Sequence, residues 1–269
     1  MELNIKTQTQ TVASEITNLQ IVTSQIISNK AIIIVPTYNR FKFFPSLIYQ
    51  FVYQTYPTNL LSMIIFDDST LNVEETKEYI DLLDDKIKSR ITYIHIADRH
   101  LPIGEKRNLL NEYAIKQGAE YIICFDDDDY YPPEKVSYAI EQMKDTGYSI
   151  CGSSILLIYY PHLKKIYKTK TKVNKIYPGH AYNGTLAYKT KYALVNKYNS
   201  EKTFGEEQSF LRNFKVGLLQ LECHKVMLCL AHGSNTIDKN DKIQFFDETN
   251  LTLNDLISDI FLLNFFNSI

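Results

Sequence analysis

Short apolar runs recur along the first half of the chain, separated by polar loops and amphipathic segments. The runs span residues 31–35, 63–66, 91–96 and 121–125. Runs of this length that are rich in β-branched and aromatic residues are typical of buried strands. Between them, apolar residues at helical spacing predict helices over 44–54, from residue 72 onward and over 104–117, with Gly118 just after the last one.

Polar residues mark two further helix starts. Asn72, with Glu75 three residues later, resembles a capping box, and Pro132-Pro133 opens a helix that Gly147 ends. Strands and helices in alternation predict an α/β fold, with a largely parallel sheet and helices on both of its faces.

The alternation stops near residue 150. Beyond it we expect an apolar strand over 150–159, an exposed hairpin over 164–177 and shorter elements. The amphipathic stretch 251–266 is expected to pack on the body of the protein, and an oligomer or membrane-surface contact is the alternative. The sequence thus predicts three segments: a polar N-terminal extension over 1–29 with a short helix around 14–27, a main domain over 30–240, and an amphipathic helical extension over 241–269.

Four consecutive aspartates, Asp126 to Asp129, directly follow the run 121–125. Adjacent carboxylates repel one another, so a fold tolerates them where cations or solvent neutralise them. Hard divalent cations take carboxylate and phosphate oxygens as ligands. A second pair, Asp67-Asp68, follows another strand, and ligands of open α/β sheets bind outside the carboxyl ends of the strands. We therefore expect both pairs at one edge of the sheet, although either pair alone is also consistent with a solvated turn.

Composition narrows the classes of function. The chain has 269 residues, of which 45% are apolar and 22% charged, with a net charge of −2 and no long basic block, so nucleic acid is not an expected partner. The four cysteines lack CxxC spacing, which favours reduced thiols. No secretory segment and no apolar stretch of roughly 20 residues is visible, so we expect no transmembrane segment and a cytoplasmic location, or a host's cytoplasm for a viral source.

Four segments in order, over residues 33–40, 66–69, 104–108 and 120–133, resemble the motifs of family 2 glycosyltransferases with the GT-A fold. The resemblance covers about residues 31–236. It implies a Rossmann-like, mostly parallel central sheet flanked by helices, with a smaller mixed β region on the acceptor side. It also implies the inverting transfer of a sugar from a UDP-sugar to an acceptor hydroxyl of a glycan, a protein or another molecule, assisted by Mn²⁺ or Mg²⁺. Whether the protein forms a homo-oligomer is left open.

Matched to these motifs, individual residues acquire expected roles in binding the donor. Those expected to bind the nucleotide-sugar are Thr37, Tyr38, Asn39, Arg40, Asp68, Arg107, Asp126 and Asp127. The family pattern gives Asp68 the hydrogen bond to uracil and Asp127 a contact with ribose or donor sugar. For Arg107 and its neighbour Lys106, a solvated helix face is the alternative. Asp126 and Asp128 are the outer acids of a DxD motif, and Asp128 is the first choice of metal ligand.

Two downstream motifs complete the implied site. Residues 205–210 resemble an acidic motif that normally reads Glu-Asp, so Glu207 would be the general base, taking the acceptor's proton. Because Glu is one methylene longer than Asp, Glu206 is the alternative base, and acids that stabilise a helix start are the alternative for both. His232 resembles the histidine that completes the metal shell or touches the diphosphate. His180 lies in a glycine-containing loop, over 179–185, that would face the donor and acceptor.

Two other functions compete with this interpretation. A nucleotidyltransferase of related architecture would use the same metal-binding acids, but such enzymes carry a glycine-rich phosphate loop after the first strand, and residues 36–39 contain no glycine. A catalytically silent module that only binds nucleotide-sugars is the second alternative, because Glu207 replaces the usual aspartate.

Overall fold

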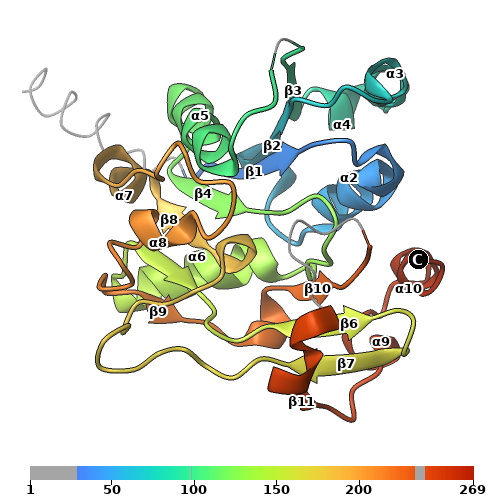
Figure 1. Cartoon of the computed structure of the whole chain (residues 1–269). Helices are drawn as coiled ribbons and strands as arrows, with labels where there is room; N and C mark the ends of the chain where they lie inside the picture. The colour runs from blue at the N-terminus through green and yellow to red at the C-terminus, as the bar shows by residue number, and fades with distance from the viewer. Residues whose placement is uncertain (1–28, 98, 234–239) are drawn as a thin grey trace, which may run out of the picture.

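The structure, a computed structural model, describes residues 29–97, 99–233 and 240–269 (Figure 1). The predicted short helix around 14–27 lies outside the described residues. Four parallel strands form the centre of the main sheet: β1 (Ala31–Thr37), β2 (Leu61–Asp67), β3 (Ile91–His95) and β4 (Tyr121–Cys124). All four predicted strands are confirmed. Each is rich in Ile, Val or aromatic residues, whose branched or flat side chains fit a pleated surface buried on both faces.

Helices cover both faces of this sheet, as predicted. They are α2 (Phe44–Tyr53), α3 (Val73–Asp81), the short α4 (Asp85–Lys88), α5 (Ile103–Lys116) and α6 (Lys135–Thr146). Gly118 and Gly147 follow α5 and α6 with φ of 77° and 76°, a backbone conformation that ends helices and favours glycine. The predicted capping box is not formed: Asn72 adopts φ of 56° and its side chain does not cap α3.

The alternation of side chains along β1 divides the core into two layers. Ile33 and Val35 face residues of α2 and α6, whereas Ile32 and Ile34 face Leu110 and other residues of α5. Successive side chains of a strand point to opposite faces, so one apolar strand supports both layers. The sheet is thereby fixed from both sides, and the loops after β1, β2 and β4 leave its carboxyl edge.

The rest of the main sheet comes from the second half of the chain. The strand order is β3-β2-β1-β4-β8-β5-β9, where β5 spans Ile150–Gly152, β8 Ala187–Lys189 and β9 Leu219–Gln220. Strand β8 is antiparallel to both β4 and β5, so the sheet is mixed at this end. Helix α7 (Thr190–Val195) follows β8 directly, and α8 (Glu207–Phe210) precedes β9.

A second, four-stranded sheet has the order β10-β6-β7-β11 and lies below strands β1 to β4 of the main sheet in Figure 1. Its strands are β6 (Leu157–Tyr160), β7 (Lys165–Lys168), β10 (Leu228–Leu230) and β11 (Asp247–Glu248). The predicted single strand over 150–159 is therefore wrong, since β5 and β6 belong to different sheets. The chain leaves the first sheet at Ser153 and Ser154, whose backbone N–H groups donate to the side chains of Thr185 and Gln220 instead of to a neighbouring strand.

The predicted hairpin over 164–177 is also wrong. Only β7 is a strand, and it pairs antiparallel with β6 before it and with β11 after it. The following residues leave the sheet because side chains take over the hydrogen bonding: Thr169 Oγ1 accepts from Leu156 N at 2.9 Å, and Ser154 Oγ accepts from Lys172 N at 2.9 Å.

The stretch 251–266 forms two short helices, α9 (Leu253–Leu256) and α10 (Ile260–Asn267). Their apolar residues Leu253, Leu262 and Phe266 are buried with Phe43 and with residues of β6 and β10. This third apolar cluster joins the end of the chain to the second sheet. No helix in the described ranges is long and apolar enough to span a bilayer.

Candidate active site

A cavity of about 1110 Å³ opens where the loops after β1 and β4 meet the second sheet. Most of the residues singled out in the sequence line it: Thr37, Tyr38, Asn39, Arg40, Arg107, Asp126, Asp127, Asp128, Glu206 and Glu207. They come from segments that are up to 170 residues apart, and the parallel strands bring them to one edge. Of the predicted set, Asp68 and His232 do not line the cavity.

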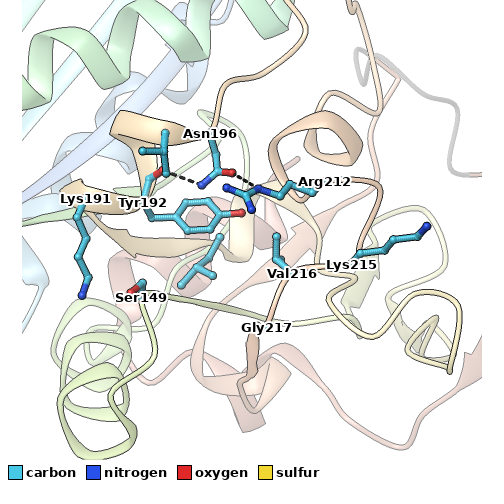
Figure 2. A pocket seen from close by; sticks show the side chains of 10 residues that line it. Ser149, Lys191, Tyr192, Asn196, Arg212, Lys215, Val216 and Gly217 are labelled. Carbon is cyan, nitrogen blue, oxygen red and sulfur yellow. Dashed lines mark hydrogen bonds between the residues drawn. The ribbon is translucent and has the colours of Figure 1, made fainter.

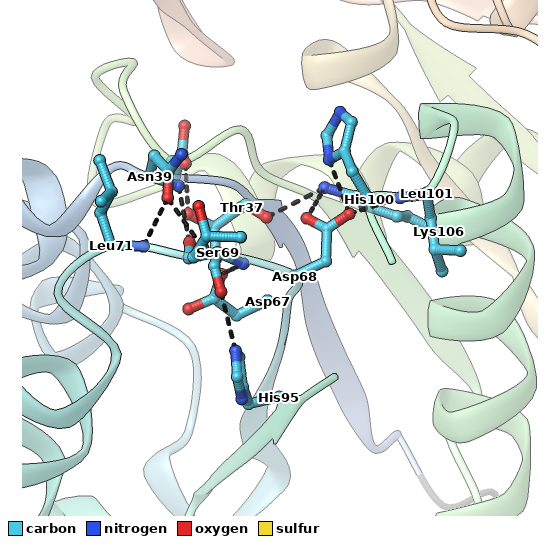
Figure 3. Close-up of polar contacts among 12 residues, drawn as sticks. Thr37, Asn39, Asp67, Asp68, Ser69, Leu71, His95, His100, Leu101 and Lys106 are labelled. Carbon is cyan, nitrogen blue, oxygen red and sulfur yellow. Dashed lines mark hydrogen bonds and ion pairs between the residues drawn. The ribbon is translucent and has the colours of Figure 1, made fainter. Parts of the chain in front are cut away.

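Asp68, at the end of β2, is held by three donors (Figure 3). Its carboxylate accepts from the Leu101 N–H at 2.6 Å, from Lys106 Nζ, and pairs with His100 Nδ1 at 2.9 Å. Lys106 Nζ also donates to the carbonyl of Thr37 at 3.1 Å, which ties β2, α5 and β1 together. The solvated-face alternative for Lys106 is wrong, since this side chain is buried against Asp68.

The rings of Tyr38 and His100 pack against each other next to this network and form an aromatic surface in the cavity wall. Their ring centroids lie 4.0 Å apart with 39° between the planes, and Lys106 Nζ lies 5.4 Å from the centroid of Tyr38. Such a surface suits stacking by a nucleobase. Sequence reasoning missed His100 because it belongs to the loop between β3 and α5, where no motif marks it.

Asn39 and Asp67 shape the loops of this edge. Asn39 has φ of 53°, and its Oδ1 accepts from the backbone N–H groups of Thr70 and Leu71, both at 3.0 Å (Figure 3). Asp67 accepts from Tyr93 Oη at 2.6 Å. Of the two adjacent acids at the end of β2, Asp67 is therefore tied to β3 and Asp68 to the segment 100–106.

The four aspartates after β4 have four different environments. Asp126 accepts from Arg107 Nη2 at 2.8 Å, and Asp127 accepts from Thr37 Oγ1 at 2.6 Å. Burial, and after it the charge of Asp128, raises the pKa of Asp127 well above its ordinary value. Asp129 accepts from the Leu230 N–H at 2.7 Å, which fixes the loop to β10. Asp128 contacts Arg40 and His232.

Asp128 Oδ2 lies 2.9 Å from His232 Nε2 and 2.5 Å from Arg40 Nη1. Two neighbouring ligands of an octahedral ion with bonds of about 2.1 Å are about 3.0 Å apart. The separation of the oxygen and nitrogen is compatible with such an ion, and it is equally that of a hydrogen bond between Asp128 and His232. In the described ranges, no three His, Cys, Asp or Glu groups are close enough to hold one ion. A divalent ion here would thus take two protein ligands, Asp128 and His232, and complete its shell with phosphate oxygens and water.

Arg107 is fully buried and bonds two acids at once. Its Nε donates to Glu206 at 2.7 Å and its Nη2 to Asp126 at 2.8 Å. Burial alone would lower the pKa of Arg107, but the Asp126 and Glu206 carboxylates raise it well above its ordinary value. The solvated-face alternative is wrong for Arg107 as well. This pairing turns the Asp126 carboxylate towards Arg107 and neutralises Glu206.

Glu207 lies next to this pair but differs from it. Its carboxylate lines the cavity and makes no hydrogen bond or ion pair with another side chain among the described residues. Burial, and after it the charge of Glu206, raises the pKa of Glu207 from 4.5 to about 7. A carboxylate with this pKa is a good proton acceptor near neutral pH. Helix α8 is a single turn here, because Arg212, Asn213 and Phe214 adopt left-handed φ values of 48°, 56° and 61°.

Lys135 is a buried cation that sequence reasoning did not identify. Its Nζ donates to the carbonyl of Cys124 at 2.6 Å and to the carbonyl of Gly184, and lies 4.0 Å from the ring centroid of Tyr131. Burial lowers the pKa of Lys135 to about 7. A Cβ at Gly184 would lie 2.6 Å from Asp126 Oδ2, so only glycine lets this turn approach the acids so closely. Lys135 thereby joins the aspartate loop to the 183–185 turn.

A second hollow, of about 510 Å³, lies beside α7 (Figure 2). Its charged residues are Lys191, Arg212 and Lys215, and Arg212 Nε donates to Asn196 Oδ1 at 2.6 Å. No carboxylate lines it, so it lacks the acids that metal binding or proton transfer requires. His180 does not line either hollow: it is buried against Phe214, and burial lowers its pKa to about 4.

Comparison with known proteins supports the interpretation of the motifs. The family model described as glycosyl transferase family 2 matches residues 32–205. No curated protein was found to match the chain. Among solved structures, S. aureus TarS matches with a TM-score of 0.52 at 19% identity, over 75% of this chain and 36% of TarS. S. aureus TarS 1–349 in complex with UDP-GlcNAc matches with a TM-score of 0.51 at 19% identity, over 77% of this chain and 60% of that one.

The mannosyltransferase PcManGT from Pyrobaculum calidifontis, in complex with GDP-Man and Mn²⁺, matches with a TM-score of 0.55 at 13% identity, over 77% of this chain and 58% of that one. The chain thus spans from about a third to 60% of the length of these proteins. At such identities the likeness concerns the fold, and it confirms the expected GT-A architecture. Because the family model covers well over half of its residues, the chain belongs to glycosyl transferase family 2.

Proposed function

We propose that the protein transfers a sugar from a UDP-sugar to an acceptor hydroxyl, with inversion at the anomeric carbon and with the help of Mn²⁺ or Mg²⁺. The observation that carries this proposal is Glu207, a carboxylate whose pKa is raised to about 7 and which lines the same cavity as the aspartate loop. A base and a diphosphate site in one cavity are what glycosyl transfer to a hydroxyl requires.

The donor would bind with uracil against Tyr38 and His100 and with the diphosphate towards Asp128. Lys106 and His100, both held by Asp68, carry N–H donors that suit the two carbonyl oxygens of uracil. Asp68, whose carboxylate is buried, would therefore influence the choice of base through these two donors. Thr37 and Asp127 would face the ribose side of the cavity.

A divalent ion bound by Asp128 and His232 would offset the negative charge that builds up on the diphosphate as it leaves. Arg107 holds Asp126 and Glu206 in place from below the cavity. Because Arg107 already neutralises Glu206, that acid serves as a positioning group, and its neighbour Glu207 keeps the free basic oxygen. This difference favours Glu207 over Glu206 as the base.

In the reaction, the acceptor hydroxyl loses its proton to the Glu207 carboxylate while its oxygen forms a bond to the anomeric carbon. The bond from that carbon to the UDP oxygen breaks on the opposite face, and its electron pair stays on the diphosphate. Aspartate is usual at the position of the base, and Glu207 is the first residue of α8.

The comparisons include complexes of other proteins with UDP-GlcNAc and with GDP-Man, so the base and sugar must be tested directly. The experiment is a panel of UDP-, GDP- and ADP-sugars, with Mn²⁺ or with excess chelator, monitored by thermal stabilisation and by release of the nucleoside diphosphate. We expect UDP-sugars with Mn²⁺ to give the largest stabilisation and to release UDP. Release of a different nucleotide, or equal stabilisation in chelator, would contradict the proposed donor or the proposed metal.

A further inference from the structure

Arg40 contacts both residues that could hold a metal ion. Its Nη1 is 2.5 Å from Asp128 Oδ2 and 3.3 Å from His232 Nε2, and those two atoms are 2.9 Å apart. All three side chains are largely buried, with 14%, 11% and 5% of their surface exposed. The guanidinium is therefore a positive charge paired directly with Asp128 in this arrangement.

These three distances limit where a metal ion can bind. An ion about 2.1 Å from both the oxygen and the nitrogen would lie no more than about 4 Å from Arg40 Nη1, whichever side of the pair it occupies. A monovalent and a divalent cation repel each other strongly at that distance in a poorly solvated site. This repulsion makes Arg40 and the ion compete for Asp128 in this geometry.

The same cavity offers Arg40 an alternative partner. Arg40 lines the cavity in which the donor diphosphate would bind, and a guanidinium forms paired hydrogen bonds with phosphate oxygens. We propose that Arg40 competes with the divalent ion for Asp128 and His232, an inference that rests on the metal site proposed above. Arg40 occupies Asp128 and His232 until a nucleotide diphosphate draws it away, and the divalent ion then takes its place.

This exchange makes the nucleotide and the metal depend on each other. The nucleotide favours metal binding because it removes Arg40 from Asp128, and by linkage the metal favours nucleotide binding by the same factor. Without Arg40, the metal would no longer have to displace a cation. Metal binding in the absence of nucleotide should then become tighter, and the coupling between the two ligands should become weaker.

The test measures Mn²⁺ binding by electron paramagnetic resonance, with and without UDP, for the wild type and for Arg40→Met and Arg40→Lys. We expect Arg40→Met to bind Mn²⁺ about tenfold or more tightly without UDP, and UDP to increase that affinity far less than in the wild type. Arg40→Lys keeps a cation at the site and should remain close to the wild type. Lys42→Met is the matched control, since it removes a neighbouring positive charge that lies over the ring of Phe43 rather than on Asp128.

Thermal unfolding gives a second readout. Arg40→Met leaves Asp128 without this cation, so the variant should be less stable than the wild type without Mn²⁺ and should gain more stability from Mn²⁺. If folded Arg40→Met binds Mn²⁺ no more tightly than the wild type, while Asp128→Asn in the wild-type background abolishes Mn²⁺ binding, the proposed role of Arg40 is overturned and the metal site is not. Mn²⁺ binding that is indifferent to Asp128→Asn would instead overturn the proposed metal site.

Discussion

Replacing Glu207 by glutamine should have opposite effects on stability and on activity. The pKa of Glu207 is raised above its ordinary 4.5 to about 7, first by burial and then by the charge of Glu206. A raised pKa in the folded state means that the carboxyl group contributes full stability below pH 4.5 and that this contribution is lost as the pH rises through about 7. Glutamine is uncharged at every pH, like the protonated acid, so the Glu207→Gln variant should not lose this stability as the pH rises.

The size of the effect follows from the shift. One pKa unit corresponds to about 1.36 kcal/mol, so the rise of the Glu207 pKa from 4.5 to about 7 corresponds to at most about 3 kcal/mol in the free energy of unfolding. Glu207 is only partly buried, and screening by the solvent that reaches it reduces this figure to about 1–2 kcal/mol. Glu207→Gln should therefore be about 1–2 kcal/mol more stable than the wild type at pH 8.5, and this advantage should vanish towards pH 4.5.

The assay is urea unfolding of both proteins across this pH range, together with the rate of sugar transfer. General-base assistance is worth typically 10² to 10⁴ in rate, so transfer by Glu207→Gln should fall by roughly that factor with UDP affinity almost unchanged. In the wild type, kcat/KM should rise with pH around an apparent pKa of about 7. A variant that is less stable than the wild type at pH 8.5 would refute the argument from burial.

Glu206→Gln is the matched control, because Glu206 is paired with the buried Arg107. Removing one partner of a buried ion pair typically costs about 3 kcal/mol or more, so this variant should be destabilised while Glu207→Gln is stabilised at high pH. If Glu206→Gln loses transfer and Glu207→Gln keeps it, Glu206 is the base. If both variants keep full transfer, the base lies elsewhere.

Three further changes test other parts of the site. Asp128→Ala should remove most of the additional thermal stabilisation that Mn²⁺ gives to the UDP complex, and an unchanged increment would exclude Asp128 as the ligand. Asp68→Asn should narrow the preference for UDP over GDP and ADP in competition binding, whereas a wild type that binds GDP as tightly as UDP would contradict the proposed base. Lys135→Met should lower the free energy of unfolding in urea by about 2–3 kcal/mol, because the carbonyls of Cys124 and Gly184 lose their donor, and an unchanged value would show that water replaces it.

Local sequence patterns predicted the part of the fold that positions the site. The runs that form β1, β2 and β4 are continuous and apolar, and Gly118 and Gly147 end helices at positions that favour glycine. Because the carboxyl ends of parallel strands meet at one edge of a sheet, the pattern of strands alone predicted that the two acidic segments lie close together. The second sheet could not be predicted from local patterns, because β6 pairs with β10, which lies about 70 residues later in the chain.

The environment of each acid could not be predicted, because it depends on partners far along the chain. Asp126 and Asp128 are two residues apart, yet one bonds Arg107 and the other bonds Arg40. Glu206 and Glu207 are adjacent, and only Glu206 reaches Arg107. Motifs predict which residue types gather at an edge, but side-chain pairing in the folded protein decides which of them keeps a free oxygen.

The most direct test of the proposed function is proton NMR of the first-formed sugar anomer, recorded while the protein, Mn²⁺ and an α-linked UDP-sugar are incubated with a hydroxyl acceptor or water. Direct attack by an oxygen that Glu207 deprotonates predicts a product with the β configuration, together with free UDP, and Glu207→Gln should slow its appearance by roughly 10² to 10⁴. An α product, or a rate that Glu207→Gln leaves unchanged, would contradict inversion with Glu207 as the base.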